Sequence, residues 1–355
     1  MPVTRIETIS DKSINYDRVG YANIDDKISK YEMQYGDVLF SHINSLKHIG
    51  KTAFYDAAQP LYHGMNLLLL RAKKSQDSKF LYYTLNTHRF LHRCQVLANQ
   101  AVNQASINTK ELKGIKISVP QMQEQQKIAG LISLLDERIA TQIKIIEKLE
   151  SLIKGIVETH YSQCDCTKQV RISELGEPFS TMNMSKEDLS EEGNECILYG
   201  ELFTTYGCVI KDVKSRTHIS TDKATTSQSN DLLFPASTTV DAMSLIAPSA
   251  ICKEGVILGG DLFGVHVNKN YNNEYLSYLI NYIYKSKLAR YAQGSTIIHL
   301  HYSDIKNATL LLPTIEEQNY LAHLMRGVEE KINIEKDMLS KLYSQKAYLL
   351  SNLFI

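Results

Sequence analysis

The sequence predicts an α+β fold in which two repeated globular domains are separated by a pair of long antiparallel coiled-coil helices. Three observations carry this prediction. The chain has 355 residues, which is too long for one comfortable core. The phrase VPQMQEQQKIAG at Val119 returns as LPTIEEQNYLAH at Leu312, 193 positions later. After each copy of this phrase, the spacing of apolar residues changes to that of a helix.

The repeat extends well beyond the phrase, and its order and spacing persist along the chain. The aligned pairs are GDVLF at Gly36 with NDLLF at Asn230, FLYYTLN at Phe80 with YLSYLIN at Tyr275, and ELKGIKISVP at Glu111 with DIKNATLLLP at Asp304. A period of this length is too long for a solenoid. We therefore expect a tandem duplication in which each copy is a domain followed by an extension.

The part of each copy before the proline mixes short β-rich runs with loops and one helical stretch. The runs are DVLFS, NLLLLRA, GIKISVP, GVILGG, LFGVHV and ATLLLP, and the helical stretches lie around Phe80 to Leu97 and Tyr275 to Tyr291. This mixture of short strands, loops and one helical stretch predicts an α+β globular domain. The expected divisions are a first domain over 1–119, a helix over 120–163, a second domain over 164–312 and a second helix over 313–355.

The part after each proline is predicted to form a long amphipathic helix. Proline and early acidic residues fit the start of a helix, and apolar residues then recur at three- and four-residue steps. The residues expected to pair the two helices and to dock partners are Ile128, Leu135, Ile139, Ile146, Leu149, Leu321, Leu324, Val328, Ile332, Leu339 and Leu342. Mutual burial of the two stripes is the favoured arrangement, and packing of each helix on its own domain is the alternative.

These residues resemble a known family. A domain that ends in an apolar strand and proline, followed by EQQKIAGLISLLDERI and, in a second copy, EEQNYLAHLMRGVEEKI, is similar to the specificity subunit of type I restriction-modification systems. The resemblance implies a non-catalytic subunit whose two target-recognition domains read the halves of a split double-stranded DNA site. It also implies two modification subunits that methylate adenine and two restriction subunits. S-adenosylmethionine, ATP and Mg would belong to those partners, with no cofactor on this chain.

The charge and hydropathy of the chain limit the classes of protein to which it could belong. The chain carries 39 basic and 39 acidic residues, which argues against indiscriminate binding of polyanions. The halves differ, because residues 1–120 carry 16 Lys+Arg against 10 Asp+Glu, whereas 166–313 carry 13 against 16. The longest apolar runs are too short to cross a bilayer and the N-terminus has no hydrophobic signal region. These features predict a cytoplasmic protein without a membrane partner.

The sequence offers little sign of chemistry of its own. It contains no phosphate-binding loop, no dinucleotide fingerprint, no HExxH motif and no Asn-Pro-Pro-aromatic motif. Cys164 and Cys166 form a C-x-C without a second pair of ligands. His299 and His301 lie close in sequence, but no carboxylate at diagnostic spacing accompanies them. We therefore predict neither a catalytic residue nor a metal site.

Candidate DNA contacts are polar side chains in the loops that differ between the copies. Arg and Lys recognise guanine and phosphate, Asn and Gln recognise adenine, and hydroxyl groups bind phosphate. In the first copy the candidates are Ser41, His42, Asn44, Lys47, His48, Lys51, Arg89, Arg93, Gln100, Asn103 and Gln104. In the second copy they are Lys211, Lys214, Arg216, His218, Lys223, Ser237, Thr238 and Thr239. For each of these, a solvated loop residue is the competing interpretation.

Two expectations concern the differences between the copies. Different loops on one scaffold predict an asymmetric, bipartite target. The stretch from Val170 to Glu195 has no counterpart in the first copy, because Met1 aligns near Glu195, so we expect a first domain that is shortened at its N-terminus. The main alternative function is a coiled-coil interaction protein that binds RNA or protein without a modification partner.

Overall fold

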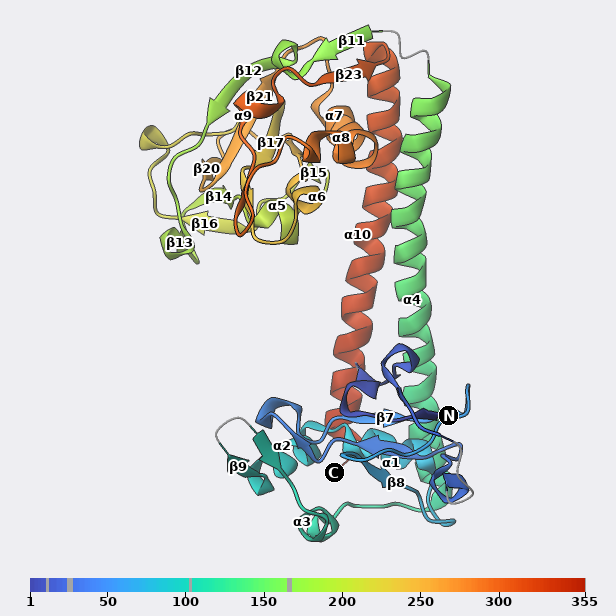
Figure 1. Cartoon of the computed structure of the whole chain (residues 1–355). Helices are drawn as coiled ribbons and strands as arrows, with labels where there is room; N and C mark the ends of the chain where they lie inside the picture. Colours follow the sequence, from blue (N-terminus) through green and yellow to red (C-terminus); the bar gives the residue numbers. More distant parts are fainter. Residues whose placement is uncertain (11–12, 24–27, 102–103, 165–167, 355) are drawn as a thin grey trace. The chain divides into compact units, whose positions relative to one another are not determined.

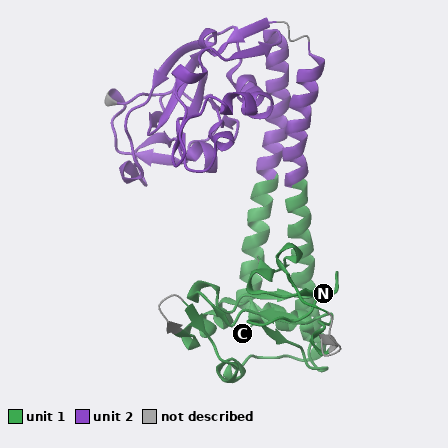
Figure 2. Ribbon diagram, viewed as in Figure 1, with its two compact units in different colours: residues 1–145, 335–355 green, residues 146–334 purple. Residues whose placement is uncertain are grey.

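The computed structural model describes residues 1–355 except 11–12, 24–27, 102–103, 165–167 and 355. The chain divides into two compact units: unit 1 is Met1–Ile145 with Glu335–Ile355, and unit 2 is Ile146–Ile334 (Figure 2). Each unit holds one globular domain and a segment of each of two long helices, α4 (Met122–Gln163) and α10 (Ile315–Asn352) (Figure 1). The predicted α+β fold of two domains with a long helix pair is confirmed.

The globular domain of unit 1 is built from short strands and three helices. The strands are β1 (Pro2–Val3), β2 (Ile9–Ser10), β3 (Ser13–Ile14), β4 (Gly20–Tyr21), β5 (Val38–Phe40), β6 (Ile43–Asn44), β7 (Thr52–Phe54), β8 (Leu68–Leu70), β9 (Asn99–Ala101) and β10 (Gln104–Ser106). The helices are α1 (Ser78–Leu85), α2 (His88–Leu97) and α3 (Thr109–Gly114). The central sheet has the order β7-β5-β8, and a second sheet has the order β6-β10-β9.

The globular domain of unit 2 contains more and longer strands. They are β11 (Lys168–Arg171), β12 (Gly176–Ser180), β13 (Leu189–Ser190), β14 (Asn194–Leu198), β15 (Val209–Ile210), β16 (Ser215–Thr217), β17 (Asp231–Pro235), β18 (Ser237–Thr238), β19 (Ser249–Ile251), β20 (Ile257–Gly259), β21 (Leu262–Val267), β22 (Ile298–His299) and β23 (Thr309–Leu312). The helices are α5 (Glu201–Thr204), α6 (Ala242–Leu245), α7 (Asn273–Leu279), α8 (Lys285–Ala289) and α9 (Tyr302–Ile305). The main sheet has the order β12-β21-β17-β19-β15.

The two central sheets share one register, which extends the sequence repeat to three dimensions. β5 pairs antiparallel with β7 and β8, as β17 does with β19 and β21. A buried aspartate at the start of each central strand pairs with a basic side chain: Asp37 directly precedes β5, and Asp231 is the first residue of β17. Asp37 binds Arg71 at 2.6 Å, and Asp231 binds His266 at 2.6 Å. Burial is the largest cause that raises the pKa of Asp231.

The two units differ at one edge of the sheet. In unit 2, β12 pairs with β21 and β11 pairs with β23. In unit 1, β8 is an edge strand, and no described residue pairs with it on its outer side. The run GIKISVP, which we predicted as a strand, has no strand among its described residues 115–119. The equivalent run in unit 2 is β23, whose ladder partner β11 has no counterpart among the described residues of unit 1.

The predicted helix around Phe80 to Leu97 is two helices, because polar side chains end the first and begin the second. The Asn86 amide donates to the Tyr82 carbonyl at 2.8 Å and to the Thr52 hydroxyl at 2.7 Å. The Thr87 hydroxyl then accepts the Phe90 N–H at 3.2 Å as the N-cap of α2. In unit 2 a single π-helical turn, Ile280–Tyr284, joins α7 to α8.

Within unit 1, α4 and α10 run antiparallel and bury a common apolar seam. Leu135, Ile139 and Leu342 form its buried cluster, with Ile143, Leu339 and Leu349 packed against it. Within unit 2, Ile146 on α4 and Leu321 and Ile332 on α10 are buried. Ile128, Leu149 and Val328 are half-buried, and Leu324 is 41% exposed. The favoured expectation of mutual burial therefore describes the helix segments of unit 1.

One polar pair interrupts this seam. The amide of Gln142 donates to both the backbone oxygen (3.2 Å) and the carboxylate of Glu335. Gln142 and Glu335 occupy equivalent positions of the two repeats and are only 5% and 7% exposed. Nearby, the Lys346 ammonium pairs with the Asp136 carboxylate. A buried polar pair of this kind fixes the register and orientation of two helices.

Within the described part of the chain, no helix is both long enough and apolar enough to span a bilayer. Both long helices carry charged residues at regular intervals along their exposed sides.

Replacing Gln142 alone by leucine should destabilise the protein by on the order of 1 to 3 kcal/mol, because the buried Glu335 carboxylate loses this donor. The double variant Gln142→Leu with Glu335→Leu should recover most of that loss, since an apolar pair costs no desolvation. Urea unfolding followed by circular dichroism measures both values, and Gln123→Leu on the exposed side of α4 is the control. A double variant less stable than the single variant would contradict this account.

Candidate nucleic-acid interface and helix junctions

A buried glutamine in the repeated phrase fastens the unit 1 domain to the start of its long helix. Gln125 lies in the first turn of α4 and is 1% exposed. Its amide nitrogen donates to the Pro120 carbonyl at 2.8 Å, and its amide oxygen accepts the Asp77 N–H at 2.9 Å. Asp77 is the N-cap of α1. One side chain therefore joins the end of the domain, the beginning of α4 and the beginning of α1.

Unit 2 repeats this junction with the same atoms. Gln318 is also 1% exposed, and its amide nitrogen donates to the Pro313 carbonyl at 3.0 Å. Its amide oxygen accepts the N–H of Asn272, the N-cap of α7, at 3.0 Å. The side chain of Asn272 also donates to Asn319 at 2.9 Å. The glutamine that the two phrases share, Gln125 in QEQ and Gln318 in EEQ, is thus the junction residue.

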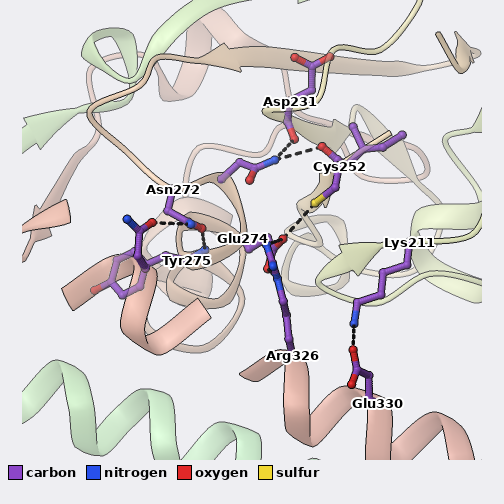
Figure 3. A network of polar contacts seen from close by, with 11 residues as sticks. Lys211, Asp231, Cys252, Asn272, Glu274, Tyr275, Arg326 and Glu330 are labelled. Carbon is purple, nitrogen blue, oxygen red and sulfur yellow. Dashed lines mark hydrogen bonds and ion pairs between the residues drawn. The ribbon is translucent and has the colours of Figure 1, made fainter. Parts of the chain in front are cut away.

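A charged network adds to the junction in unit 2 (Figure 3). Glu274, which is 1% exposed, accepts two hydrogen bonds from the Arg326 guanidinium on α10 at 2.6 and 2.7 Å. The Cys252 thiol donates to the same carboxylate at 3.0 Å. Lys211 binds Glu330 one helical turn further along α10 at 3.2 Å. Bidentate charged contacts of this kind hold a fixed geometry between domain and helix.

Of the equivalent positions in unit 1, one pair uses different side chains, whereas Tyr83 and Asp136 align with a second tyrosine and carboxylate, Tyr278 and Glu329. Lys79 donates to the Ser133 hydroxyl at 2.8 Å, in place of the Glu274–Arg326 pair. The Tyr83 hydroxyl donates to the Asp136 carboxylate at 2.9 Å. Burial and then the charge of Asp136 raise the pKa of Tyr83, so this phenol remains a donor. The junction has one geometry and two chemistries.

In unit 1 the structure brings two of the predicted DNA-contacting stretches into one ribbon. Strand β10 lies between β6 and β9, so Ala105 is opposite both Asn44 and Gln100. Gln104 is exposed, whereas Asn103 and the side chain of Gln100 lie outside the described residues. Strands β6 (Ile43–Asn44) and β10 (Gln104–Ser106) are thus neighbours in space, although helices α1 and α2 lie between them in the sequence.

The remaining candidates of this ribbon differ in exposure. Ser41 is buried and its hydroxyl accepts from the Asn44 amide at 3.3 Å. His42 is half-buried, and burial followed by the charge of His63 lowers the pKa of its ring. The exposed candidates are Lys47 and Lys51, with His48 half-buried in the turn between them.

Unit 2 builds the equivalent ribbon from β18 and β22. Ser237 pairs with His299, and Thr238 pairs with Ile298. Ser237 is buried, Thr238 is half-buried and Thr239 is exposed. His299 stacks on His301 with ring centroids 6.1 Å apart. The ribbon therefore presents hydroxyl and imidazole groups and carries no lysine or arginine.

The stretch from Lys211 to Lys223 lies in a different sheet of unit 2 from the ribbon. Arg216 lies on β16 and donates to the Gly193 carbonyl at 2.9 Å, while Lys211 is engaged with α10. Lys214 and His218 are exposed, and the side chain of Lys223 lies outside the described part. Two of these candidates thus already have partners within the protein.

A basic hollow lies beside α2 in unit 1. Arg89 and Arg93 are exposed one turn apart on α2, and together with Lys116 they line a depression of about 60 Å³ that also includes Thr87 and Ser118. Two guanidinium groups, an ammonium group and hydroxyls form a set that suits a phosphate. Lys116 was missed in the sequence, because the run that contains it was interpreted as a strand.

The helices also expose an apolar stripe, and of its residues only Leu324 was among those predicted to pair the helices or dock partners. On α4, Leu131, Leu134, Ile145 and Leu152 are 38–65% exposed, and at about 100° per residue they fall on one face about 60° wide. On α10 the exposed residues include Tyr320, Leu324, Ile334 and Met338. Leu131 with Leu324 and Ile145 with Met338 are equivalent positions of the repeats. The seam pattern hid these residues, because they lie beside it.

The four free cysteines among the described residues, Cys94, Cys196, Cys208 and Cys252, are poorly suited to nucleophilic chemistry. Burial is the largest cause that raises the pKa of Cys94, Cys208 and Cys252 to about 12 and that of Cys196 to about 11. They are therefore thiols at neutral pH. In the described residues no group of three or more His, Cys, Asp or Glu side chains is placed to hold a metal. Cys166 of the C-x-C lies outside the described chain.

Comparisons with known proteins agree with this arrangement. The family model of the type I restriction modification DNA specificity domain matches residues 1–151 and again 167–343. A protein of Methanocaldococcus jannaschii named "putative type I restriction enzyme MjaX specificity subunit" is 31% identical, over 96% of this chain and 84% of its own length.

Solved structures show the same fold. The S subunit of a type I restriction-modification system from M. genitalium superposes with a TM-score of 0.59 at 18% identity, over 92% of this chain and 85% of that one. A chain from a structure of type I restriction-modification complex assembly gives 0.57 at 14% identity, over 91% and 82%.

The chain belongs to the type I restriction-modification DNA specificity family. It carries two copies of the family's domain and is a specificity subunit, a non-catalytic class whose catalysis resides in partner subunits. These matches do not favour the alternative of an unrelated coiled-coil interaction protein.

Gln125→Ala and Gln318→Ala should each destabilise the protein by on the order of 1 to 3 kcal/mol, because each leaves a buried N–H and a buried carbonyl without a partner. Hydrogen exchange at the amide of Asp77 should accelerate only in the first variant, and that at Asn272 only in the second. Gln123→Ala, on the exposed side of α4, is the matched control. Equal exchange at both amides in all variants would refute the junction role.

Proposed function

We propose that this chain reads an asymmetric, bipartite double-stranded DNA target, with one half-site contacted by each globular domain. The observation that carries the proposal is the pair of ribbons. Both domains build a ribbon from equivalent segments on a shared scaffold, β6 with β10 and β18 with β22, yet the side chains differ. Two ribbons with the same backbone arrangement but different hydrogen-bond donors and acceptors select different bases.

The polar side chains of each ribbon support a preference for different bases. The first ribbon offers Asn44 and Gln104 as amides, which pair with adenine edges, and Lys47 and Lys51 as cations for guanine or phosphate. The second offers Thr238, Thr239 and His299, which donate and accept single hydrogen bonds. Indirect readout of DNA shape also contributes to the selection of each half-site.

The two domains differ in the positive charge that they can offer to DNA phosphates. The basic hollow of Arg89, Arg93 and Lys116 provides a backbone anchor in the first domain. The first 120 residues carry 16 basic against 10 acidic residues, whereas 166–313 carry 13 against 16. The second domain therefore depends more on a partner subunit for positive charge near the DNA.

The exposed stripe of the helices supports docking of two modification subunits. Leu131 and Leu324 are 49% and 41% exposed at equivalent positions, and Ile145 and Met338 are 38% and 40% exposed. Equivalent surfaces bind equivalent partners. On this proposal two restriction subunits complete the assembly, the partners bring S-adenosylmethionine, ATP and Mg, this chain binds no cofactor, and the complex acts on DNA in the cytoplasm.

Mapping methylated adenines tests the bipartite target. Cells that express this chain with its modification partner should show methylation in two short, different half-sites separated by unread bases. The variant Arg89→Ala with Arg93→Ala should lower the extent of methylation without changing the motif, because phosphate contacts position and base contacts specify. A continuous palindromic motif, or no methylation that depends on this gene, would sink the proposal.

Stoichiometry tests the docking surface. Leu131→Asp and Leu324→Asp should each reduce the modification subunits per chain from two to one, since each places a charge in one apolar contact. The double variant should bind none. Native mass spectrometry of the co-expressed complex measures the ratio, and Gln123→Asp on the exposed side of α4 is the control. Undiminished binding by the double variant would place the docking surface elsewhere.

A further inference from the structure

A hollow beside the ribbon of unit 2 has neither lysine nor arginine among the described residues that line it. Its volume is about 520 Å³, and its lining residues are Asp261, Gln293, Gly294, His299, His301 and Asp304. His299 belongs to β22, one of the two strands of the ribbon. The two carboxylates make this hollow unsuited to a phosphate, because like charges repel. They suit the edge of a nucleobase that presents hydrogen-bond donors.

The backbone holds Asp261 in place at the edge of this hollow. Asp261 is the middle residue of a three-residue turn between β20 and β21, in which the Leu262 N–H donates to the Gly260 carbonyl at 3.0 Å. The Ala236 N–H donates to the Asp261 carbonyl at 2.8 Å, and the Leu300 N–H donates to the Ala236 carbonyl at 2.9 Å. Ala236 directly precedes β18 and Leu300 directly follows β22. These hydrogen bonds therefore fix Asp261 beside both strands of the ribbon.

The carboxylate of Asp261 is available to a ligand. Asp261 is exposed, and within the described part of the chain its carboxylate takes part in no hydrogen bond or ion pair. The second carboxylate of the hollow is already engaged, because Asp304 accepts the His301 backbone N–H at 2.8 Å. Asp261 thus offers both of its carboxylate oxygens as acceptors at a fixed place beside the ribbon.

A free carboxylate distinguishes the bases by the groups that they present in the major groove, because it can only accept hydrogen bonds. Guanine and thymine present acceptors, which repel it, whereas cytosine presents the N4 amino group. Adenine presents its amino group beside the N7 acceptor, a pair that an amide serves better. We propose that Asp261 selects a cytosine in the second half-site by accepting a hydrogen bond from the N4 amino group. This inference rests on the proposed role of the ribbons in reading DNA.

The two imidazoles of the hollow complete the recognition of this base pair. The guanine that pairs with the cytosine presents its O6 and N7 acceptors in the same groove. His299 and His301 stack with ring centroids 6.1 Å apart and line the hollow together with Asp261. Each neutral imidazole has one N–H that can donate to these acceptors. The hollow therefore combines an acceptor for the cytosine with donors for its guanine partner.

The variant Asp261→Asn tests this assignment, because it replaces a pure acceptor by an amide of the same size, and an amide pairs with adenine. The full chain is co-expressed with its modification partner, and methylated adenines are mapped by sequencing. We expect one half-site of the unaltered protein's motif to contain a cytosine that is preferred about tenfold over other bases. The Asp261→Asn protein should prefer adenine at that position, and Asp261→Ala should show no preference there.

The rest of the motif serves as an internal control. The other half-site should be unchanged in both variants, because Asp261 lies in the second domain. Asp212→Asn is the matched control, since Asp212 is equally exposed but directly follows Lys211, which contacts α10. This variant should leave every position of the motif unchanged.

Three results would overturn the assignment, and they differ in what else they affect. An unchanged motif in the Asp261→Asn protein would remove Asp261 from base reading and leave the two readers intact. Weaker methylation at all sites with the same motif would show that Asp261 affects binding without selecting a base. A map of the unaltered protein without two different half-sites would overturn the proposed function itself, and the assignment with it.

Discussion

The architecture depends on one buried amide in each repeat. A recognition domain is joined to its long helix by one peptide connection, and in unit 1 apolar side chains such as Phe80 and Ile132 also pack between them. The glutamine side chain adds two hydrogen bonds that reach to the N-cap of the domain's own helix, so the helix has a second, rigid attachment. A rise of about 1.5 Å per residue makes the precision important, because twenty residues form a lever of about 30 Å. A rotation of about 5° at the junction therefore moves its end by about 2.6 Å.

The same amide explains why the repeated phrase is conserved within the chain while its surroundings vary. Glutamine has both a donor and an acceptor at one end of its side chain, and the junction uses both. Glutamate would lose the donor and bury a charge. The neighbouring contacts are less demanding, because any well-packed polar pair can tie the domain to the helix at the next turn. Lys79 with Ser133 in one repeat and Glu274 with Arg326 in the other satisfy that requirement.

Sequence patterns predicted the features that local chemistry determines. The helix pair was predictable, because apolar residues at three- and four-residue steps can be buried only on a helix face, and the duplication was visible as spacing. The break at Asn86 was not, because it depends on Thr52, a residue from a distant strand. Ile115–Val119 has the alternation of a strand, but a strand also needs a partner, and periodicity does not show whether one exists. The joining of residues 41–51 to 99–106 likewise arises only from tertiary pairing.

The repeats also show how one scaffold accommodates different residues along the edge of its central sheet. Where β12 lays Phe179 over Gly264, unit 1 fills the same volume from its own β8 with Leu69, so its core is closed without a neighbour. The buried aspartate is treated similarly. His266, stacked on Phe179 with centroids 4.2 Å apart, pairs with Asp231 in unit 2, whereas Arg71 reaches Asp37 in unit 1. Arginine keeps its charge without an aromatic cover. Different side chains therefore serve the same packing and charge requirements in the two sheets, although β8 is an edge strand among the described residues and β21 pairs on both sides.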